Sequence, residues 1–138
     1  PQAWVLAPPW LGKSTVAVNL AVAAARAGRR VGLLDVDVFG PSLPTMMGRT
    51  GLRAELNAAR KLAPIEAHGV AAMSIGYLVD PEQAVSWRGP MVSAAVNQLI
   101  GDVAWSDDRG DLDILFIDTP PGTGEVQLTL LQKLALSG

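Results

Sequence analysis

The sequence of 138 residues contains no cysteine. This excludes disulfide bonds, thiol catalysis and thiolate metal sites within the chain. Aromatic residues are also scarce, at 5% of the sequence, whereas hydrophobic residues make up 49%. Aliphatic side chains must therefore fill the core. The length suffices for one hydrophobic core of ordinary size but not for two domains that each have their own core.

Strong charge of either sign and long apolar runs are absent as well. The formal net charge is -2 and no basic run is present, so electrostatics gives no reason to expect a nucleic-acid or anionic-membrane partner. No apolar run approaches the ~20 residues of a membrane span, and no signal-peptide pattern is visible. We therefore expect a cytoplasmic protein, or one of an organellar matrix if the source is eukaryotic.

The first 38 residues predict a parallel crossover unit. Residues 4–6 form a short apolar strand, residues 14–27 form an alanine-rich helix, and residues 31–38 form a continuous aliphatic strand. Such a strand suits burial on both faces of a sheet. The helix is apolar on most of its faces, so we expect it to be buried, and Gly28 is placed to end it.

The remainder of the sequence continues the alternation of strands and helices. The patterns predict a long loop at 40–51, a short polar helix at 52–63, a strand at 69–76, a loop at 79–87, an amphipathic helix at 89–103, a strand at 111–118 and a final helix at 124–138. The predicted fold class is α/β, with a doubly wound, mostly parallel sheet and helices on both faces. We expect residues 1–138 to form a single domain that is truncated on its C-terminal side.

The stretch "APPWLGKST" at residues 7–15 ends like a phosphate-binding loop. It follows the first predicted strand directly and precedes the first helix. At a helix N-terminus, unpaired backbone N–H groups and the helix dipole favour phosphate. A lysine at the position of Lys13 neutralises the outer phosphates, and a hydroxyl at the position of Ser14 binds magnesium. The alternative is a chance Gly-Lys-Ser-Thr at a helix start.

Acidic residues end two of the predicted strands. Asp35 and Asp37 lie at the carboxyl end of 31–38, and Asp118 ends 111–118. Ligands of open parallel sheets bind beyond the carboxyl ends of the strands, where these carboxylates can hold magnesium or an attacking water. An isolated Asp-x-Asp is more often a turn or cap, but together with the lysine loop the three acids indicate a nucleotide site.

Five blocks of the sequence resemble the Mrp/ApbC family of ATP-binding iron–sulfur cluster carriers, which are relatives of the MinD and ParA ATPases. The resemblance runs from Val5 to about Gln132, through "GKSTVAVNLA", "VGLLDVDVFGPSLPTMMG", "MSIGYLVD", "WRGPMVSAAVNQL" and "DILFIDTPPGTGEVQLTL". It implies a P-loop NTPase fold, incomplete here, and a nucleotide-binding domain that dimerises in the complete protein.

The resemblance also implies roles for residues of the phosphate loop and the strand ends. Gly12, Lys13, Ser14 and Thr15 would bind the nucleotide, with Lys13 also catalytic and Ser14 a magnesium ligand. Asp37 would orient the hydrolytic water with Asp35 beside it at the nucleotide, and Asp118 would be the second magnesium contact. Gly122 would belong to a switch-like loop with Pro120, Pro121 and Gly124, and Gly40, Pro41 and Ser42 would follow the acid pair.

The sequence departs from the family pattern in the first half of the loop. The family reads Gly-Lys-Gly-Gly where this chain has Ala7, Pro8, Pro9 and Trp10. The extra lysine that reaches the partner subunit's nucleotide is missing, and the two prolines remove backbone N–H donors. Each lost charge-assisted donor costs roughly 1.5–3 kcal/mol, or about one to two decades of affinity. Weak nucleotide binding with slow hydrolysis is therefore the expectation.

The implied cofactors are ATP and Mg²⁺. An iron–sulfur cluster belongs only to the full-length family, whose Cys-x-x-Cys pair lies outside these residues, and the implied partners are a second copy of the protein and iron–sulfur recipient proteins. Three functions remain open from the sequence: an ATP-hydrolysing iron–sulfur carrier, a non-hydrolysing pseudo-ATPase or interaction module, and a partition ATPase of the MinD/ParA type. The Trp-Arg-Gly-Pro block at 87–90 and the Pro-Pro-Gly-Thr-Gly-Glu-Val-Gln-Leu block at 120–128 argue against the third, as does the lack of a basic or amphipathic membrane tail in these residues.

Overall fold

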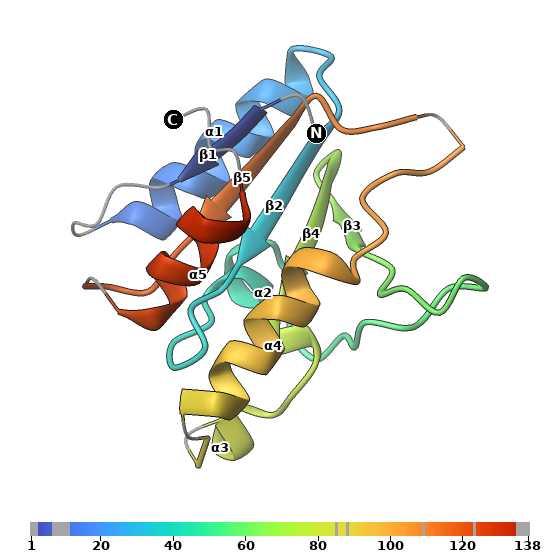
Figure 1. The fold of residues 1–138 in the computed structure, drawn as a ribbon. Helices are drawn as coiled ribbons and strands as arrows, with labels where there is room; N and C mark the ends of the chain where they lie inside the picture. Colours follow the sequence, from blue (N-terminus) through green and yellow to red (C-terminus); the bar gives the residue numbers. More distant parts are fainter. Residues whose placement is uncertain are drawn as a thin grey trace.

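A computed structural model describes residues 3–6, 12–84, 86, 87, 89–108, 110–122 and 124–134. Within these residues, five strands form one sheet in the order β1-β5-β2-β4-β3 (Figure 1). The strands are β1 (Ala3–Leu6), β2 (Val31–Asp35), β3 (Ile65–Ala67), β4 (Val70–Ser74) and β5 (Ile114–Asp118).

Four of the strands run parallel, and their carboxyl ends lie at one edge of the sheet. β5 lies between β1 and β2, and β2 also pairs with β4. The register places Asp35 opposite both Asp118 and Ser74. β3 alone is antiparallel, because a tight turn at His68 and Gly69, both with positive φ, folds it back on β4.

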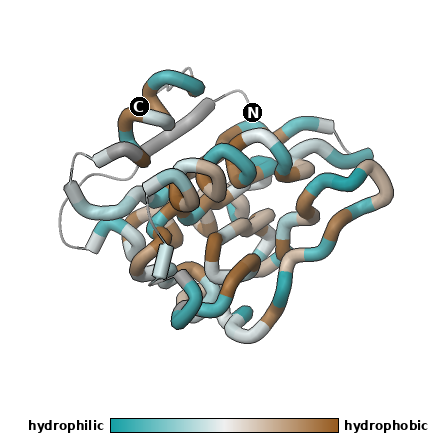
Figure 2. The backbone as a smooth tube through the Cα atoms, turned by 60° about the horizontal axis from the view of Figure 1, so that its bottom comes forward, coloured by the Kyte–Doolittle hydropathy of each residue, from teal (hydrophilic) through white to brown (hydrophobic). Residues whose placement is uncertain are grey.

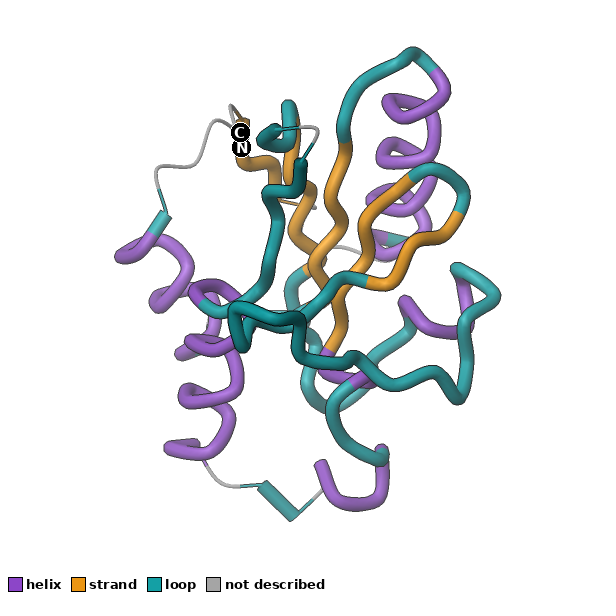
Figure 3. The backbone as a smooth tube through the Cα atoms, turned by 90° about the vertical axis from the view of Figure 1, so that its right-hand side faces the viewer, coloured by secondary structure: helices purple, strands orange, loops and turns teal. Residues whose placement is uncertain are grey.

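Helices cover both faces of the sheet (Figure 3). α1 (Lys13–Arg26) packs on one face against β2 and β5, while α4 (Gly89–Gly101) and α5 (Glu125–Lys133) pack against each other on the other face. The short helical turns are α2 (Leu43–Met46), α3 (Pro81–Ala84) and the 3₁₀ segment η1 (Ile75–Tyr77). Among the described residues, no helix has both the length and the apolar character to cross a membrane.

The core lies between these two layers and the sheet. All five residues of β2 and all five of β4 are buried, and α4 contributes Val92, Val96 and Leu99 from its inner face. Figure 2 shows hydrophobic and hydrophilic residues alternating along the helices and outer loops, with further hydrophobic segments running through the middle of the molecule. Aliphatic side chains form most of this core, as the composition predicts.

The predicted α/β fold with a mostly parallel, doubly wound sheet is confirmed. Each long predicted strand and helix is present, although the second strand ends at Asp35 rather than at residue 38. The last helix ends at Lys133, and residues 135–138 of that prediction lie outside the described residues. The predicted burial of the first helix is wrong: α1 buries Ala17 and Ala21, while Val16 is 43% and Leu20 is 50% exposed. One face of α1 packs on the sheet, and described residues leave the opposite apolar face uncovered.

The region between β2 and β4 and the loop before α4 differ from the expectation. Residues 52–63 form no helix; an antiparallel bridge between Leu56 and Leu62 closes them into an extended loop. The predicted loops at 40–51 and 79–87 contain the one-turn helices α2 and α3. β3 has no counterpart among the predicted elements.

Candidate functional site

The N-terminus of α1 lies at the carboxyl edge of the sheet, and its first-turn backbone N–H groups have no partner among the described residues. Gly12 precedes the helix in the left-handed conformation, with φ of +86°, which glycine adopts without strain. No described side chain caps the helix, and its first turn contains no acidic residue. The N–H groups of the first turn and the positive end of the dipole therefore remain for an anionic ligand.

Lys13 and Asp37 face each other beside this helix end. Lys13 Nζ lies 3.9 Å from Asp37 Oδ2, and both side chains are 14% exposed. The distance exceeds that of a hydrogen bond, so the two charges attract without direct bonding. The other oxygen of Asp37, Oδ1, accepts a hydrogen bond from the backbone N–H of Gly40 at 3.2 Å, which fixes the side chain in its own turn.

Ser14 and Asp118 form a second pair at the same helix end. Asp118 ends β5 and is 3% exposed. Burial raises the pKa of Asp118, while a hydrogen bond from Ser14 and the charge of Lys13 lower it. Asp118 Oδ1 is buried and has no hydrogen-bond partner among the described residues. A buried acceptor without a partner is costly, which points to a ligand at this position.

The residues present fit a magnesium ion. Ser14 and Asp118 supply hydroxyl and carboxylate oxygens, the donors that Mg²⁺ prefers, and the free Oδ1 of Asp118 is an open ligand position. Described residues contain no group of three His, Cys, Asp or Glu that could enclose a metal. In nucleotide sites, Mg²⁺ typically uses one or two protein ligands together with phosphate oxygens and water.

Asp35 lies deeper than the other two acids. It is completely buried, and its two oxygens accept hydrogen bonds from three protein donors: the backbone N–H of Asp37, the backbone N–H of Leu43 and the hydroxyl of Ser74. Burial raises its pKa to about 7, against the lowering effect of these donors. The sequence places Asp35 at the nucleotide, whereas its oxygens face the protein interior.

The loop after β5 is braced by Gln127, a residue that the motif analysis does not single out. Its Oε1 accepts from the backbone N–H of Gly124 at 2.9 Å, and its Nε2 donates to the carbonyl of Pro120 at 2.7 Å. The Gly-Glu-Val-Gln spacing at the start of α5 is the signal that could have identified it, because Gln at the third helical position reaches back to the N-cap. Gly122 lies between the two residues that Gln127 bonds, Pro120 and Gly124, and has a φ of +95°.

The other predicted positions are distributed around this centre. Thr15 is exposed on the first turn of α1, and its carbonyl accepts from Asn19. The substituted half of the loop, Ala7, Pro8, Pro9 and Trp10, lies outside the described residues, as does Arg88 of the Trp-Arg-Gly-Pro block.

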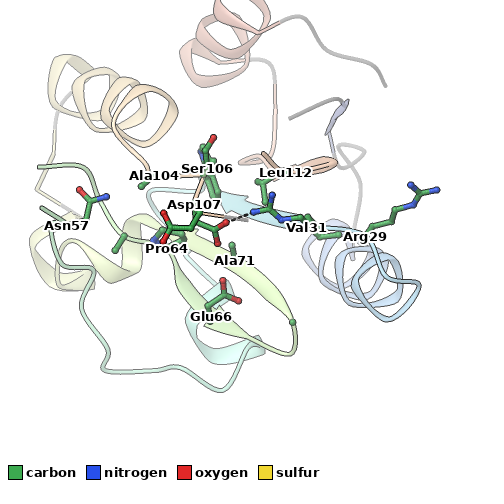
Figure 4. Close-up of a pocket in the computed structure, with 15 residues that line it drawn as sticks. Arg29, Val31, Asn57, Pro64, Glu66, Ala71, Ala104, Ser106, Asp107 and Leu112 are labelled. Carbon is green, nitrogen blue, oxygen red and sulfur yellow. Dashed lines mark hydrogen bonds and ion pairs between the residues drawn. The ribbon is translucent and has the colours of Figure 1, made fainter. Parts of the chain in front are cut away.

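Two cavities of similar size lie at opposite edges of the sheet. The first, of about 540 Å³, adjoins the candidate site and is lined by Asp37, Gly40, Pro120, Pro121 and the start of α5, among others. The second, of about 570 Å³, lies at the amino edge between β2, the 57–66 segment and the 104–108 segment (Figure 4). None of the predicted site residues lines the second cavity.

These features together define a class: an α/β protein of the P-loop type, in which a lysine and a serine at a helix N-terminus lie beside acids at two strand ends. Residues 10–138 match the family model described as "ParA: NUBPL iron-transfer P-loop NTPase". The chain belongs to this family, and the resemblance predicted from the sequence is confirmed.

Individual relatives agree with this assignment. The chain is 52% identical over 128 residues to an iron–sulfur cluster carrier protein of Deinococcus radiodurans, an alignment that covers 93% of this chain and 35% of that protein. It is 48% identical over 128 residues to the protein of the same name from Escherichia coli K12, covering 93% of this chain and 34% of the relative. The chain thus spans about a third of the length of these curated relatives.

A solved structure shares the architecture. The nucleotide-binding protein of Archaeoglobus fulgidus in complex with ADP superimposes with a TM-score of 0.71 at 35% sequence identity. The superposition covers 94% of this chain and 48% of the archaeal chain.

Proposed function

We propose that residues 1–138 form one P-loop domain, the nucleotide-binding part of an ATP-dependent iron–sulfur cluster carrier. The observation that carries this proposal is the convergence of Lys13, Ser14, Asp37 and Asp118 on the N-terminus of α1. The names of the curated relatives support the carrier function, and the ADP complex of the archaeal neighbour supports a nucleotide as the ligand.

The phosphate chain of ATP would bind at the first turn of α1. The backbone N–H groups of Lys13, Ser14 and Thr15 would donate to phosphate oxygens, because they have no intrahelical partner. Lys13 would supply the positive charge for the outer phosphates. Its 3.9 Å separation from Asp37 leaves it free of a direct hydrogen bond, so it would reach the phosphate without breaking one.

Hydrolysis would depend on Asp37, which lies next to Lys13 and beside the cavity at the carboxyl edge. Its carboxylate would accept a hydrogen bond from the attacking water and orient that water. Mg²⁺, when bound, would neutralise developing negative charge on the phosphate oxygens. Ser14 and Asp118 are the residues that would hold it, through the serine hydroxyl and the unpartnered Oδ1 of the aspartate.

The cluster itself would be cargo of the complete protein. This chain has no cysteine, so thiolate ligands would come from elsewhere in the polypeptide, consistent with a chain that spans a third of its relatives. We also propose that the complete protein acts as a homodimer, delivers clusters to recipient proteins and works in the cytoplasm.

Calorimetric titration of the chain with MgATP tests the nucleotide site. We expect binding with a dissociation constant of about 0.1–1 mM, weakened by the Ala7–Trp10 substitution. Lys13→Ala should reduce the affinity at least 10-fold, since a charge-assisted contact is worth roughly 1.5–3 kcal/mol. Lys61→Ala, which removes an exposed lysine from the 52–63 loop, is the matched control and should leave the affinity unchanged. Equal affinities for wild type and Lys13→Ala would refute the assignment.

A non-hydrolysing nucleotide-binding module is the second candidate, and the observation that favours it is the loss of loop donors at Pro8 and Pro9. Replacement of residues 7–10 by Gly-Lys-Gly-Gly separates the two. If this variant hydrolyses ATP and the natural sequence only binds it, the second candidate is correct. Measurable phosphate release by the natural sequence, abolished by Lys13→Ala, would establish the first.

A further inference from the structure

One buried carboxylate holds both ends of the loop that carries Asp37. Oδ1 of Asp35 accepts from the backbone N–H of Asp37 at 3.0 Å, and Oδ2 accepts from the backbone N–H of Leu43 at 3.2 Å. Both donors belong to residues 36–43, here called the Asp37 loop. The side chain of Asp35 therefore anchors this loop near its start and at its end. A further bond from the Val36 N–H to the Asp118 carbonyl ties the start of the loop to β5.

Ser74, on the neighbouring strand β4, orients this carboxylate. Its hydroxyl donates to Oδ2 of Asp35 at 3.1 Å, while its oxygen accepts from the backbone N–H of Gly76, also at 3.1 Å. The second bond fixes the hydroxyl rotamer and directs its proton to Asp35. Ser74 is completely buried, so water cannot replace either bond.

Gly76 lets Pro41 of the Asp37 loop and Pro44 of the adjoining helix α2 approach. A Cβ on Gly76 would lie 3.0 Å from the side chain of Pro44 and 3.3 Å from that of Pro41. The prolines that follow the acid pair are thus seated directly on the backbone after Ser74. The loop is held by hydrogen bonds to Asp35 and by packing on Gly76.

From this arrangement we infer that Asp35 and Ser74 are positioning residues for ATP hydrolysis: they fix the Asp37 loop so that the Asp37 carboxylate stays beside Lys13. This inference rests on the proposed function. Asp35 acts through the backbone of Asp37 rather than on the nucleotide, because all three of its described donors are protein groups. Misplacement of a catalytic group by about 1 Å can cost as much as 100-fold in rate, whereas phosphate binding at α1 does not involve the Asp37 loop.

The predicted signature is therefore a loss of turnover without a loss of affinity. Ser74→Ala removes the hydroxyl that orients Asp35, and we expect kcat to fall about 10-fold while the dissociation constant for MgATP changes less than 3-fold. Ser74→Thr retains the hydroxyl and should restore most of kcat. Ser106→Ala is the matched control: it removes another serine–aspartate bond, that to Asp111 at the amino edge, and should leave kcat unchanged.

A double-mutant cycle with Asp37→Ala distinguishes positioning from general destabilisation. If Ser74 acts through Asp37, Ser74→Ala has no further effect on kcat once Asp37 is removed. Amide hydrogen exchange supplies a readout that requires no turnover: in Ser74→Ala the amides of Asp37 and Leu43 should exchange at least 5-fold faster, and those of α4 should not change. Should a threonine or alanine at 74 prevent folding, Asp35→Asn offers the same exchange test: an amide nitrogen cannot accept, so the bond from either Asp37 or Leu43 is lost and that amide should exchange faster.

The outcomes separate the two proposals. If wild type neither binds nor hydrolyses MgATP, the proposed function fails and the positioning role fails with it. If wild type hydrolyses ATP but folded Ser74→Ala retains its kcat, or loses affinity and kcat equally, the positioning role alone is overturned. A fall in kcat that persists undiminished in the Asp37→Ala background would also contradict it.

Discussion

The two edges of the sheet differ in how their charges are paired. At the amino edge, Arg30 donates to the carboxylate of Asp107 at 2.7 Å and to the carbonyl of Asp111 at 2.7 Å, and its backbone N–H donates to Asp113. At the carboxyl edge, Lys13 and Asp37 stand 3.9 Å apart, and Asp118 retains a buried oxygen with no described partner.

Cavity size does not distinguish these edges, since the volumes are about 570 and 540 Å³. The edges differ in whether their charged groups have hydrogen-bond partners among the described residues. The guanidinium of Arg30 donates its hydrogen bonds to acceptors within the protein. It thereby joins the segment before β2 to the segment before β5, which is a structural role. The carboxyl edge presents donors and acceptors that a bound phosphate and cation would complete. We therefore expect substitutions there to change nucleotide binding or turnover, and substitutions at the amino edge to leave both unchanged.

The largest expected effect is a pH dependence of stability that originates in Asp35. Its pKa is about 7 in the folded protein, against 3.8 for the unfolded chain, so the folded state binds the proton more tightly. Protonated Asp35 therefore adds to the free energy of unfolding. This contribution is roughly 4 kcal/mol, is fully present below pH 3.8 and is lost as the pH rises through about 7. Urea unfolding from pH 4 to 8 should therefore show a smaller loss for Asp35→Asn than for wild type.

A matched comparison isolates this effect from other carboxylates. Asp108→Asn changes an exposed acid at the amino edge and should reproduce the wild-type curve. Asp118 contributes to the pH dependence of stability with the same sign, because burial also raises its pKa. The quantity to measure is therefore the difference between the unfolding free energies of wild type and Asp35→Asn at each pH. Parallel curves for those two proteins would show that Asp35 ionises alike in the folded and unfolded states.

Removal of the Asp37 charge should abolish most turnover while leaving the nucleotide bound. Asp37→Asn keeps the size of the side chain but weakens it as an acceptor for the attacking water, and we expect kcat to fall roughly 100- to 1,000-fold. Phosphate release and calorimetry on the same preparations give kcat and affinity. Glu55→Gln, in the exposed 52–63 loop, is the control; an Asp37→Asn protein with wild-type kcat would place the water-orienting group elsewhere.

Sequence patterns were sufficient to predict those parts of the fold and the candidate site that depend on one dominant interaction. Continuous aliphatic runs predicted β2 and β5, because a strand buried on both faces requires them. Gly28, with φ of +83°, ends α1 by closing the last turn with Arg29. The residues predicted at the nucleotide, Lys13, Ser14, Asp37 and Asp118, converge because parallel strands end at one edge.

Other features depended on tertiary contacts that a single sequence does not display. The polar stretch 52–63 has a composition that favours a helix, but Leu62 instead bridges to both Leu56 and Val103. β3 has only three residues and one buried side chain, too few for a periodic signal. The bonds from Ser74 and Leu43 to Asp35 join residues 39 and 8 positions apart, so Asp35 could be recognised as an acid at a strand end but not as the centre of a hydrogen-bond network.

At the amino edge, Gly32→Ala should cost stability without touching the nucleotide site. A Cβ at this position in β2 would lie 2.5 Å from Leu112 Cδ1 and 2.6 Å from Leu115 Cδ1, so the buried leucines must repack. We expect the free energy of unfolding to fall by about 1–3 kcal/mol, with MgATP affinity within 2-fold of wild type. Gly101→Ala, where a Cβ meets no described atom of another segment within 4 Å, should cause no loss of stability; a comparable loss there would mean that the crowding at Gly32 is not the cause.

The smallest effect is expected from Arg30→Ala, although Arg30 lines the cavity at the amino edge. The ion pair with Asp107 is partly exposed, with side chains 28% and 42% accessible, and such pairs contribute at most about 1 kcal/mol. Urea unfolding should show a loss of roughly that size relative to Arg29→Ala, an exposed neighbour at the same cavity. Nucleotide affinity should be unchanged in both variants, because the amino edge lies at the far end of every parallel strand. A marked loss of MgATP binding in Arg30→Ala would break the division between a structural edge and a functional one.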